Sequence, residues 1–346
     1  MNHEEISVLI LAAGKGTRMV SDLAKVLHPV GGAPMLSYVL ETTQKLKPAK
    51  TVVVIGHQAE QVKKAFAHVP KVEWIRQKQM KGTGDAVASA SHAFAGNKGD
   101  VLVLYGDIPS IRIETLRRLY MLHRSSKHVM TLLTADLDNP TGYGRIVLSA
   151  DGSVEKIVEE KDASLSEKEI QEINTGIGIY DSQFLFQSVR KLTPANKQNE
   201  LYLTDLVTIA NSAKKIVGRL RIKDPTEVLG INDREGQADV ARYIYENHLS
   251  SLMKTGVSFE DPATIIVEPQ VIMAKDIWIE SNTGFRGDSK VHTRVHVGSG
   301  TQVLHSEIGA GTVIGSHVVI ENARIGSAVS IGSGTVIGKK LQVKEV

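Results

Sequence analysis

The chain has 346 residues and a net charge of +3, and its length suggests two domains. Its residues are 42% hydrophobic and 23% charged, as in globular proteins, and the aromatic share of 5% indicates mainly aliphatic cores. It contains no cysteine, which excludes a disulfide framework and a thiolate zinc site and fits a reducing compartment. We find no signal peptide, no apolar run near the roughly 20 residues of a membrane span and no basic face for nucleic acid, so we expect a cytoplasmic protein.

Up to about Pro225 the sequence alternates short aliphatic runs with segments of helical periodicity. The runs that predict strands are residues 8–11, 51–55, 101–104 and 129–134. The segments that predict helices are residues 35–46, 59–67, 85–94 and 113–123. This alternation predicts a Rossmann-like α/β domain over residues 1–233, with a mostly parallel sheet covered on both faces. Ligands of such sheets bind beyond the carboxyl ends of the strands.

The first predicted strand runs into Leu-Ala-Ala-Gly-Lys-Gly-Thr-Arg-Met at residues 11–19. Gly14 and Gly16 allow a sharp turn whose backbone N–H groups would cradle phosphate oxygens. The segment is not a dinucleotide-binding motif, because Met19 replaces the last glycine, and it is not a Walker A loop. A tight strand–helix turn with an exposed arginine is the alternative interpretation.

Two cations accompany this loop, Arg18 at its end and Lys25 further along the chain. Arginine can brace phosphate oxygens through two hydrogen bonds, whereas lysine provides a compact charge. A lone lysine is usually a solvated surface residue. Beside the glycine loop and Arg18, Lys25 favours a phosphate-binding site.

The second half of the sequence has a different period. Residues 234–256 are predicted as a linker helix with an apolar side that includes Val240 and Ile244. Residues 257–346 follow a hexapeptide repeat, interrupted by two one-residue slips, which predicts a parallel β-helix with one inward aliphatic side chain per rung. The predicted inward residues are Val267, Met273, Ile279, Phe285, Val291, Val297, Val303, Ile308, Ile314, Ile320, Ile325, Ile331, Ile337 and Val343.

The glycine loop with its downstream lysine resembles the signature of the sugar nucleotidyltransferases. Further segments, in the same order along the chain, resemble the bacterial bifunctional N-acetylglucosamine-1-phosphate uridylyltransferase/glucosamine-1-phosphate acetyltransferase family more closely. These segments are QKQMKGTGDA (77–86), YGDIP (105–109), PTGYGRI (140–146), IVEEKD (157–162), INTG (173–176) and GIN (230–232). The resemblance implies a nucleotidyltransferase domain followed by a left-handed β-helix that associates as a homotrimer.

The resemblance also implies roles for individual residues. The implied catalytic residues are Arg18, Lys25 and Asp107. The implied substrate-binding residues are Leu11, Ala12, Ala13, Gly14, Gln77, Gly82, Thr83, Tyr105, Gly106, Gly144, Glu159, Asn174 and Asn232. Within this set, Ala12, Ala13, Gln77, Gly82 and Thr83 hold the uracil and ribose, and Gly144, Glu159 and Asn174 hold the sugar. The segment 200–205 closes near the sugar.

Asp107 and Asn232 are the implied protein ligands of a Mg²⁺ cofactor, which prefers oxygen donors and keeps several waters. Asp107 follows the strand at residues 101–104 directly, at the end where a metal would lie. Without its neighbours in Tyr-Gly-Asp-Ile-Pro, such an aspartate would as readily be a turn or capping residue.

The expected reaction transfers UMP from UTP to N-acetylglucosamine-1-phosphate, giving UDP-N-acetylglucosamine, a peptidoglycan precursor, and pyrophosphate. The attacking phosphate is already an anion, so no general base is needed, and catalysis is positioning and charge neutralisation. The alternatives are another sugar-1-phosphate or another nucleotide, such as dTTP or GTP, and a non-catalytic scaffold that binds sugar nucleotides.

Three features depart from the family pattern. Ala24 stands where a proline usually precedes the lysine, and Asp85 stands where histidine is common. The β-helix ends at Val346, and the segment that carries the family's acetyltransferase site has no counterpart here. We therefore do not expect acetyl transfer; either the protein is naturally monofunctional or the chain is a shortened form.

Overall fold

A computed structural model describes residues 6–338 of the chain. They fall into two compact units, residues 6–28 with 34–237 (unit 1) and residues 29–33 with 238–338 (unit 2). The predicted boundaries assign residues 29–33 to the first domain, whereas this hairpin belongs to unit 2. The hairpin approaches the rest of unit 2 closely at Gly32, where a Cβ atom would lie 2.3 Å from the carboxyl carbon of Glu268.

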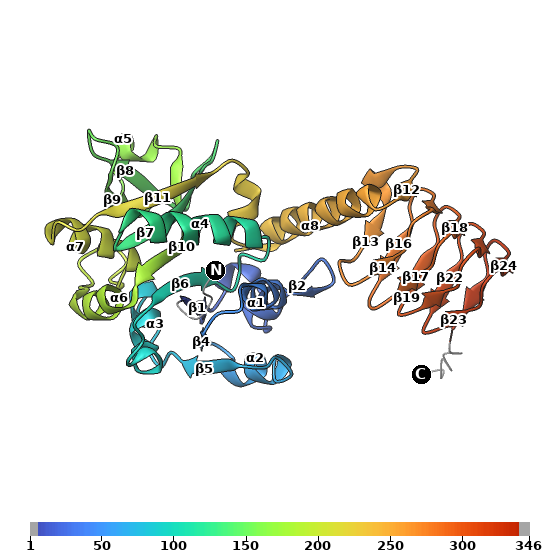
Figure 1. The fold of residues 1–346 in the computed structure, drawn as a ribbon, viewed down its shortest axis with the longest axis horizontal. Coiled ribbons are helices and arrows are strands. Elements are labelled where there is room, and N and C mark those ends of the chain that lie inside the picture. The colour runs from blue at the N-terminus through green and yellow to red at the C-terminus, as the bar shows by residue number, and fades with distance from the viewer. Residues whose placement is uncertain (1–5, 339–346) are drawn as a thin grey trace. The chain divides into compact units, whose positions relative to one another are not determined.

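Unit 1 is built on one twisted sheet, whose strands are labelled in Figure 1. Its main strands are β1 (Ile6–Ala12), β4 (Lys50–Ile55), β5 (Val72–Arg76), β6 (Asp100–Tyr105), β7 (Met130–Asp136), β10 (Glu172–Asp181) and β11 (Val217–Ile222). They follow the order β11-β7-β10-β6-β1-β4-β5, and only β10 among them pairs antiparallel with its neighbours. The predicted mostly parallel sheet is therefore confirmed.

A small antiparallel extension leaves the sheet at β10. Strand β8 (Gly144–Leu148) pairs with the start of β10 and with β9 (Val154–Val158). A short helix, α5 (Leu165–Lys168), begins with a capping box at Ser164 and follows β9. This extension carries the segments 140–146 and 157–162 that the sequence singled out.

Helices cover both faces of the sheet because β1 is apolar on both sides. Val8 and Ile10 pack into one core, and Leu9 and Leu11 pack into the other, as the alternation of strand side chains requires. The first core contains residues of α1 (Met35–Leu46), α2 (Ala59–Ala65) and α4 (Ile113–Ser126). The second contains residues of α3 (Thr83–Ser89), α6 (Ser182–Ser188) and α7 (Leu206–Ser212).

Unit 2 contains most of α8 (Arg234–Lys254) and a series of short strands that lie side by side in Figure 1. The strands are β12 (Val257–Phe259), β13 (Ile266–Val267), β14 (Ile272–Met273), β15 (Ile277–Ile279), β16 (Gly284–Arg286), β17 (Lys290–Val291), β18 (His296–Val297), β19 (Gln302–Leu304), β20 (Glu307–Ile308), β21 (Val313–Ile314), β22 (Val319–Glu321), β23 (Arg324–Ile325), β24 (Ser330–Ile331) and β25 (Val336–Ile337). Three parallel sheets each take every third strand, which confirms the predicted β-helix.

The two slips in the hexapeptide repeat fall at the same corner of successive coils. Phe285 pairs with Val303, 18 positions further on (303 − 285), whereas Val303 pairs with Ile320, 17 positions further on (320 − 303). Each later coil is one residue shorter, and the inward side chains stay in line. Every predicted inward residue from Val267 to Ile337 belongs to the core of unit 2 or packs against it, while Val343 lies outside the described residues.

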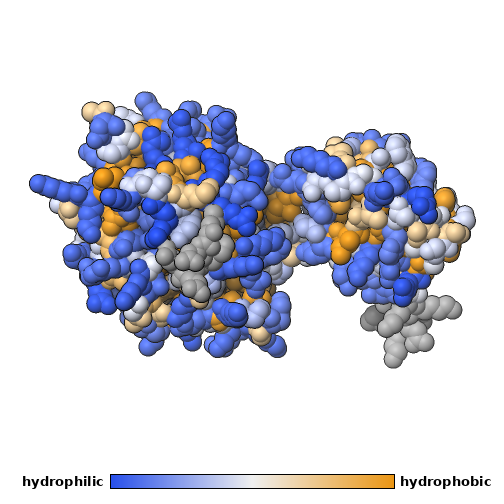
Figure 2. All heavy atoms as spheres, viewed as in Figure 1, coloured by the Kyte–Doolittle hydropathy of each residue, from blue (hydrophilic) through white to orange (hydrophobic). Residues whose placement is uncertain are grey.

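The outer surface of unit 1 is mainly hydrophilic on the face in view in Figure 2, with small separate apolar patches. Among the helices of residues 6–338, none has the length and apolar character that crossing a membrane requires.

Candidate active site

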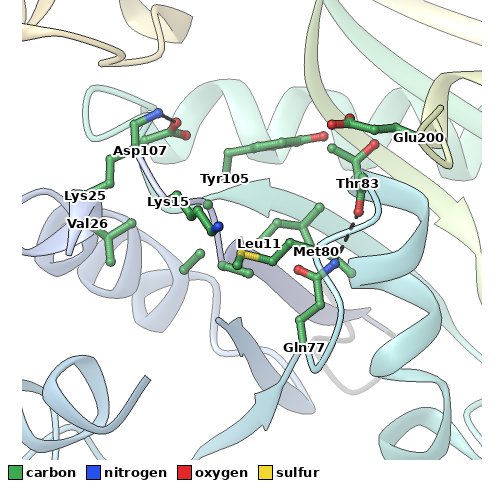
Figure 3. Close-up of a pocket in the computed structure, with 15 residues that line it drawn as sticks. Leu11, Lys15, Lys25, Val26, Gln77, Met80, Thr83, Tyr105, Asp107 and Glu200 are labelled. Carbon is green, nitrogen blue, oxygen red and sulfur yellow. Dashed lines mark hydrogen bonds and ion pairs between the residues drawn. The ribbon is translucent and has the colours of Figure 1, made fainter. Parts of the chain in front are cut away.

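A cavity of about 470 Å³ opens where β1 and β6 end, at the carboxyl edge of the sheet in unit 1. The predicted site residues that line it are Leu11, Ala12, Ala13, Gly14, Lys25, Gln77, Gly82, Thr83, Tyr105 and Asp107. Lys25 and Asp107 lie at one end of the view in Figure 3, and Gln77 and Thr83 lie at the other. The cavity is therefore elongated between a charged end and an amide-bearing end.

The glycine loop brings Lys25 to the charged end. Gly16 has a φ of 62°, in the left-handed region, and a Cβ atom there would lie 2.7 Å from the Cβ of Lys25. At Gly14 an added Cβ would meet nothing within 4 Å. The residue that permits the close approach of the loop to Lys25 is therefore Gly16, and Gly14 leaves open space beside the cavity.

The ammonium group of Lys25 lies between two oxygen acceptors from distant parts of the chain. It forms an ion pair with Asp107 and donates to Oδ1 of Asn232 at 2.9 Å. The backbone N–H of Ile231 donates to the carbonyl of Asp107 at 2.9 Å, which holds the two loops together. One carboxylate and one amide oxygen thus converge on a single cationic group.

This donor pair fits Mg²⁺, because both atoms are hard oxygen ligands and the lysine already marks a place for positive charge between them. Among residues 6–338, no group of three or more His, Cys, Asp or Glu side chains is arranged to hold a metal ion. Asp107 and Asn232 would therefore need substrate phosphates and water to complete the coordination of Mg²⁺.

At the other end, the side chain of Gln77 is buried and its amide nitrogen is bonded. Nε2 donates to Oδ2 of Asp85 at 2.7 Å and to the carbonyl of Gly82 at 3.4 Å. Asp85, which departs from the family pattern, is thus the stronger partner of a predicted substrate-binding residue.

The segment 200–205 closes this end of the cavity against the start of α3. Gly82 has a φ of 108°, and a Cβ atom there would lie 2.6 Å from the carbonyl oxygen of Leu201. The N–H of Leu203 donates to the hydroxyl of Thr83 at 3.0 Å. Gly82 is therefore required both by its backbone conformation and by this close packing.

Gly144, Glu159 and Asn174 lie near one another on the antiparallel extension. Asn174 is the pairing partner of Gly144, and a Cβ atom on Gly144 would lie 3.4 Å from the carboxylate of Glu159. The hydroxyl of Thr204 donates to Glu159 at 3.0 Å. Burial, and the negative charges of Asp205, Asp162 and Glu200, raise the pKa of the Glu159 carboxyl despite this hydrogen bond.

Tyr105 lies between the residues around Thr83 and those around Glu159. Its ring packs on Gly176, where a Cβ atom would lie 2.5 Å away, and Thr83 bonds its hydroxyl. Burial raises the pKa of the phenol, and the charges of Glu159 and Asp107 raise it further. Tyr105 therefore remains a neutral hydroxyl between the two carboxylates.

Not every predicted residue lines the cavity. Arg18 is exposed on the loop, and among residues 6–338 no acceptor binds its guanidinium. Burial raises the pKa of nearby Tyr143, and the charge of Arg18 opposes that rise. Gly106 acts through its backbone, whose N–H donates to the carbonyl of Leu11 at 2.9 Å. Asn232 is connected to the cavity through Lys25. The three residues of the antiparallel extension lie outside the lining.

The sequence reasoning missed some lining residues, notably Lys15 and Met80. Lys15 could have been predicted, because it stands between the two glycines of the loop. Met80 lies in the segment 77–86, but no chemical signal distinguishes it from a loop residue that packs elsewhere.

A glycine loop at the end of the first strand of a parallel sheet, with a lysine and an aspartate beside it, is suited to nucleotide phosphates. Residues 8–168 match the family model of the MobA-like NTP transferase domain, and the chain is a nucleotidyltransferase.

The similarity to individual proteins extends beyond this domain. The chain is 41% identical over 323 residues to the bifunctional protein GlmU of Streptococcus equi subsp. zooepidemicus, which covers 93% of this chain and 70% of that protein. It is 42% identical over 323 residues to GlmU of Streptococcus mutans serotype c, with the same coverage. With GlmU of Pelobacter propionicus it shares 38% identity over 346 residues, 98% of this chain and 75% of the relative. The chain belongs to the GlmU family.

Proposed function

We propose that the protein transfers UMP from UTP to N-acetylglucosamine-1-phosphate, releasing pyrophosphate. The observation that carries this proposal is the convergence of Lys25, Asp107 and Asn232 at one end of a cavity whose other end presents the Gln77 amide. A nucleoside triphosphate has the matching polarity, since an uncharged base and a charged phosphate chain lie at its two ends. Membership of the GlmU family supports the sugar nucleotide as product.

The cavity suits the nucleotide through contacts of two kinds. Lys15 and Lys25 line it and would neutralise phosphate oxygens, and exposed Arg18 lies on the same loop. Gln77 and the backbone of Gly82 offer polar groups for the edge of the base.

Asp107 and Asn232 would hold Mg²⁺, which when bound supplies positive charge to the triphosphate. To admit it, the ammonium group of Lys25 must leave the point where their oxygens converge. Lys25 would then bind a phosphate oxygen, so that the same side chain pairs with Asp107 and Asn232 without substrate and assists the cation in the complex.

In the proposed reaction an oxygen of the sugar phosphate attacks the α-phosphorus of UTP. A new phosphorus–oxygen bond forms, the bond to the β-phosphate oxygen breaks, and pyrophosphate leaves with the electron pair. No proton has to move, because the attacking group is already an anion. Lys25 and Arg18 would orient the phosphates, and Gly144, Glu159 and Asn174 would hold the sugar.

The test is pyrophosphate release from UTP with N-acetylglucosamine-1-phosphate and Mg²⁺. Parallel reactions replace UTP by dTTP or GTP, and the sugar by glucose-1-phosphate. We expect rapid release with the first pair and at least about tenfold slower release with each replacement. Faster turnover of another pair would reassign the substrate, and no release by folded protein with any pair would reject the enzymatic proposal in favour of a binding scaffold.

A further inference from the structure

The orientation of the Gln77 amide is determined by its two neighbours. Nε2 faces Oδ2 of Asp85 at 2.7 Å and the carbonyl of Gly82 at 3.4 Å, and both of these groups are acceptors. If the amide were rotated by half a turn, its oxygen would face two other oxygens and lose both hydrogen bonds. The orientation therefore follows from the chemistry of the partners.

The amide oxygen of Gln77 remains available to accept a hydrogen bond from a ligand in the cavity. Within residues 6–338 no donor binds Oε1 of Gln77, and the residue lines the cavity. In Figure 3 the amide nitrogen of Gln77 is on the side of Thr83, where the dashed line begins, and the amide oxygen points to the opposite side. Gln77 thus presents a pure acceptor to whatever occupies this end.

Asp85 is held in a position where it can accept the hydrogen bond from the Gln77 amide. It lies in the first turn of α3, where the exposed N–H groups of the helix favour a negative charge, and its Oδ2 also accepts from the N–H of Lys81 at 3.4 Å. Its side chain is half-buried and α3 is anchored through the N–H of Gly84, which donates to Leu201 at 2.8 Å. The carboxylate therefore lies behind Gln77, outside the lining of the cavity, and is held by α3 and the N–H of Lys81.

We infer that Asp85 is a positioning residue that makes the site selective for a base with a ring N–H, and so for uracil over cytosine. The inference rests on the proposed function, which places the base beside Gln77. Uracil carries a hydrogen on N3 and can donate to Oε1 of Gln77, whereas N3 of cytosine is an acceptor and would face that oxygen without a hydrogen. The carboxylate acts on the base only through the glutamine.

The test compares UTP and CTP as substrates, by kcat/KM, in the full chain and two variants. Asp85→Ala removes the acceptor and leaves only the weaker bond to Gly82, so that both orientations of the Gln77 amide become accessible. We expect the preference for UTP over CTP to fall by about 10- to 100-fold. Asp85→Asn retains an acceptor in one of its two orientations and should keep an intermediate preference.

The matched control is Glu60→Ala. Glu60 is an exposed acidic residue in the first turn of α2, another seven-residue helix, and it does not line the cavity. Loss of charge at a helix start, without any effect on Gln77, should leave the UTP/CTP ratio unchanged. If both Asp85 variants lower turnover of the two nucleotides equally, Asp85 has a structural role only and the inference is overturned.

Binding measurements separate this inference from the proposed function. Calorimetric titration of UTP and CTP without sugar phosphate reports the same selectivity whether or not turnover occurs. A wild-type protein that is inactive but binds UTP more tightly than CTP, with the difference lost in Asp85→Ala, would reject the reaction and support the role of Asp85. Equal ratios in wild type and Asp85→Ala would overturn the role of Asp85 even if uridylyl transfer is established.

Discussion

Nζ of Lys25 donates to Oδ1 of Asn232 at 2.9 Å, although the two residues are 207 positions apart in the chain. The same ammonium pairs with Asp107, so the lysine satisfies two oxygens that would otherwise both be directed at one point. A divalent ion and this side chain would therefore compete for one place when no substrate is bound.

Replacing Lys25 by methionine should separate metal binding from catalysis. We expect Lys25→Met to bind Mg²⁺ about tenfold more tightly without substrate, because no ammonium competes for the two oxygens. Turnover should fall by about 100-fold or more, because a charge that orients the phosphates is lost. Calorimetry with Mg²⁺ and a pyrophosphate-release assay measure the two effects. Lys15→Met, in the same cavity, should not tighten Mg²⁺ binding, and a weaker affinity in Lys25→Met would contradict the competition.

The two glycines of the loop should respond differently to alanine. Gly16→Ala places a Cβ atom 2.7 Å from that of Lys25 at a φ of 62°, and we expect a loss of about 1–2 kcal/mol in unfolding free energy. Gly14→Ala enters open space and should change that free energy by less than about 0.5 kcal/mol. Urea unfolding of unit 1 provides the measurement. Equal losses in the two variants would show that the approach of the loop to Lys25 is not what requires glycine.

Glu159 should make stability depend on pH in the sense opposite to a salt-bridged carboxylate. Because its pKa in the folded protein is raised above the ordinary value of 4.5, the folded state holds the proton more tightly than the unfolded state. Its contribution to stability therefore falls as pH rises from that value through the folded pKa, and the penalty is complete above it.

Glu159→Gln removes this penalty. The melting temperature of the variant should exceed that of the wild type at neutral pH, and the difference should vanish on acidification below the ordinary carboxyl pKa. Catalytic efficiency should fall, since the side chain is proposed to hold the sugar. Glu155→Gln, at an exposed position of β9, the strand that precedes Glu159, should show no such trend. A melting temperature difference that is independent of pH would contradict the assignment.

The buried guanidinium of Arg145 should make Glu160 a stabilising residue. The side chain of Arg145 is 2% exposed and bonds Glu160 at 2.7 Å, while the exposed Lys168 approaches the same carboxylate at 3.4 Å. We expect Glu160→Ala to cost about 3–5 kcal/mol, because the buried guanidinium loses its charged partner and keeps the carbonyl of Tyr143 as a neutral acceptor. Lys168→Ala should cost less than about 1 kcal/mol. Thermal unfolding of both variants is the measurement, and similar small losses would show that Arg145 finds another partner.

The sequence predicted those parts of the fold that depend on local pattern. Strands β1, β4, β6 and β7 and helix α1 follow from runs and periodicities that are complete within a dozen residues. The coils of unit 2 repeat one hexapeptide pattern, so each repeat strengthens the prediction of the β-helix. The antiparallel β10 was not predicted, because its orientation depends on pairing with β6 and β7, which lie far away in the chain.

The candidate site was predictable to the extent that residues stand in motifs. The sequence of the loop alone predicted that Lys25 lies beside the glycines. The contact of Lys25 with Asn232 depends on the fold of unit 1 as a whole, and Asn232 was placed at the site only through the family resemblance. The bond from Gln77 to Asp85 was not foreseen, although only eight positions separate them, because it requires α3 to begin at Thr83. The roles of the site residues, the homotrimer and the lack of acetyl transfer stay predictions.

The cluster of Lys25, Asp107 and Asn232 also constrains how the protein becomes functional during folding. The chain between Asp107 and Asn232 includes every strand from β7 to β11, and the bond from Ile231 to Asp107 closes only when that stretch has returned to β6. Contacts of such long sequence separation form late, because a large loop must be ordered first. During refolding, this cluster should therefore appear after secondary structure and collapse are complete, so a partly folded chain would lack the proposed place for Mg²⁺ and the triphosphate.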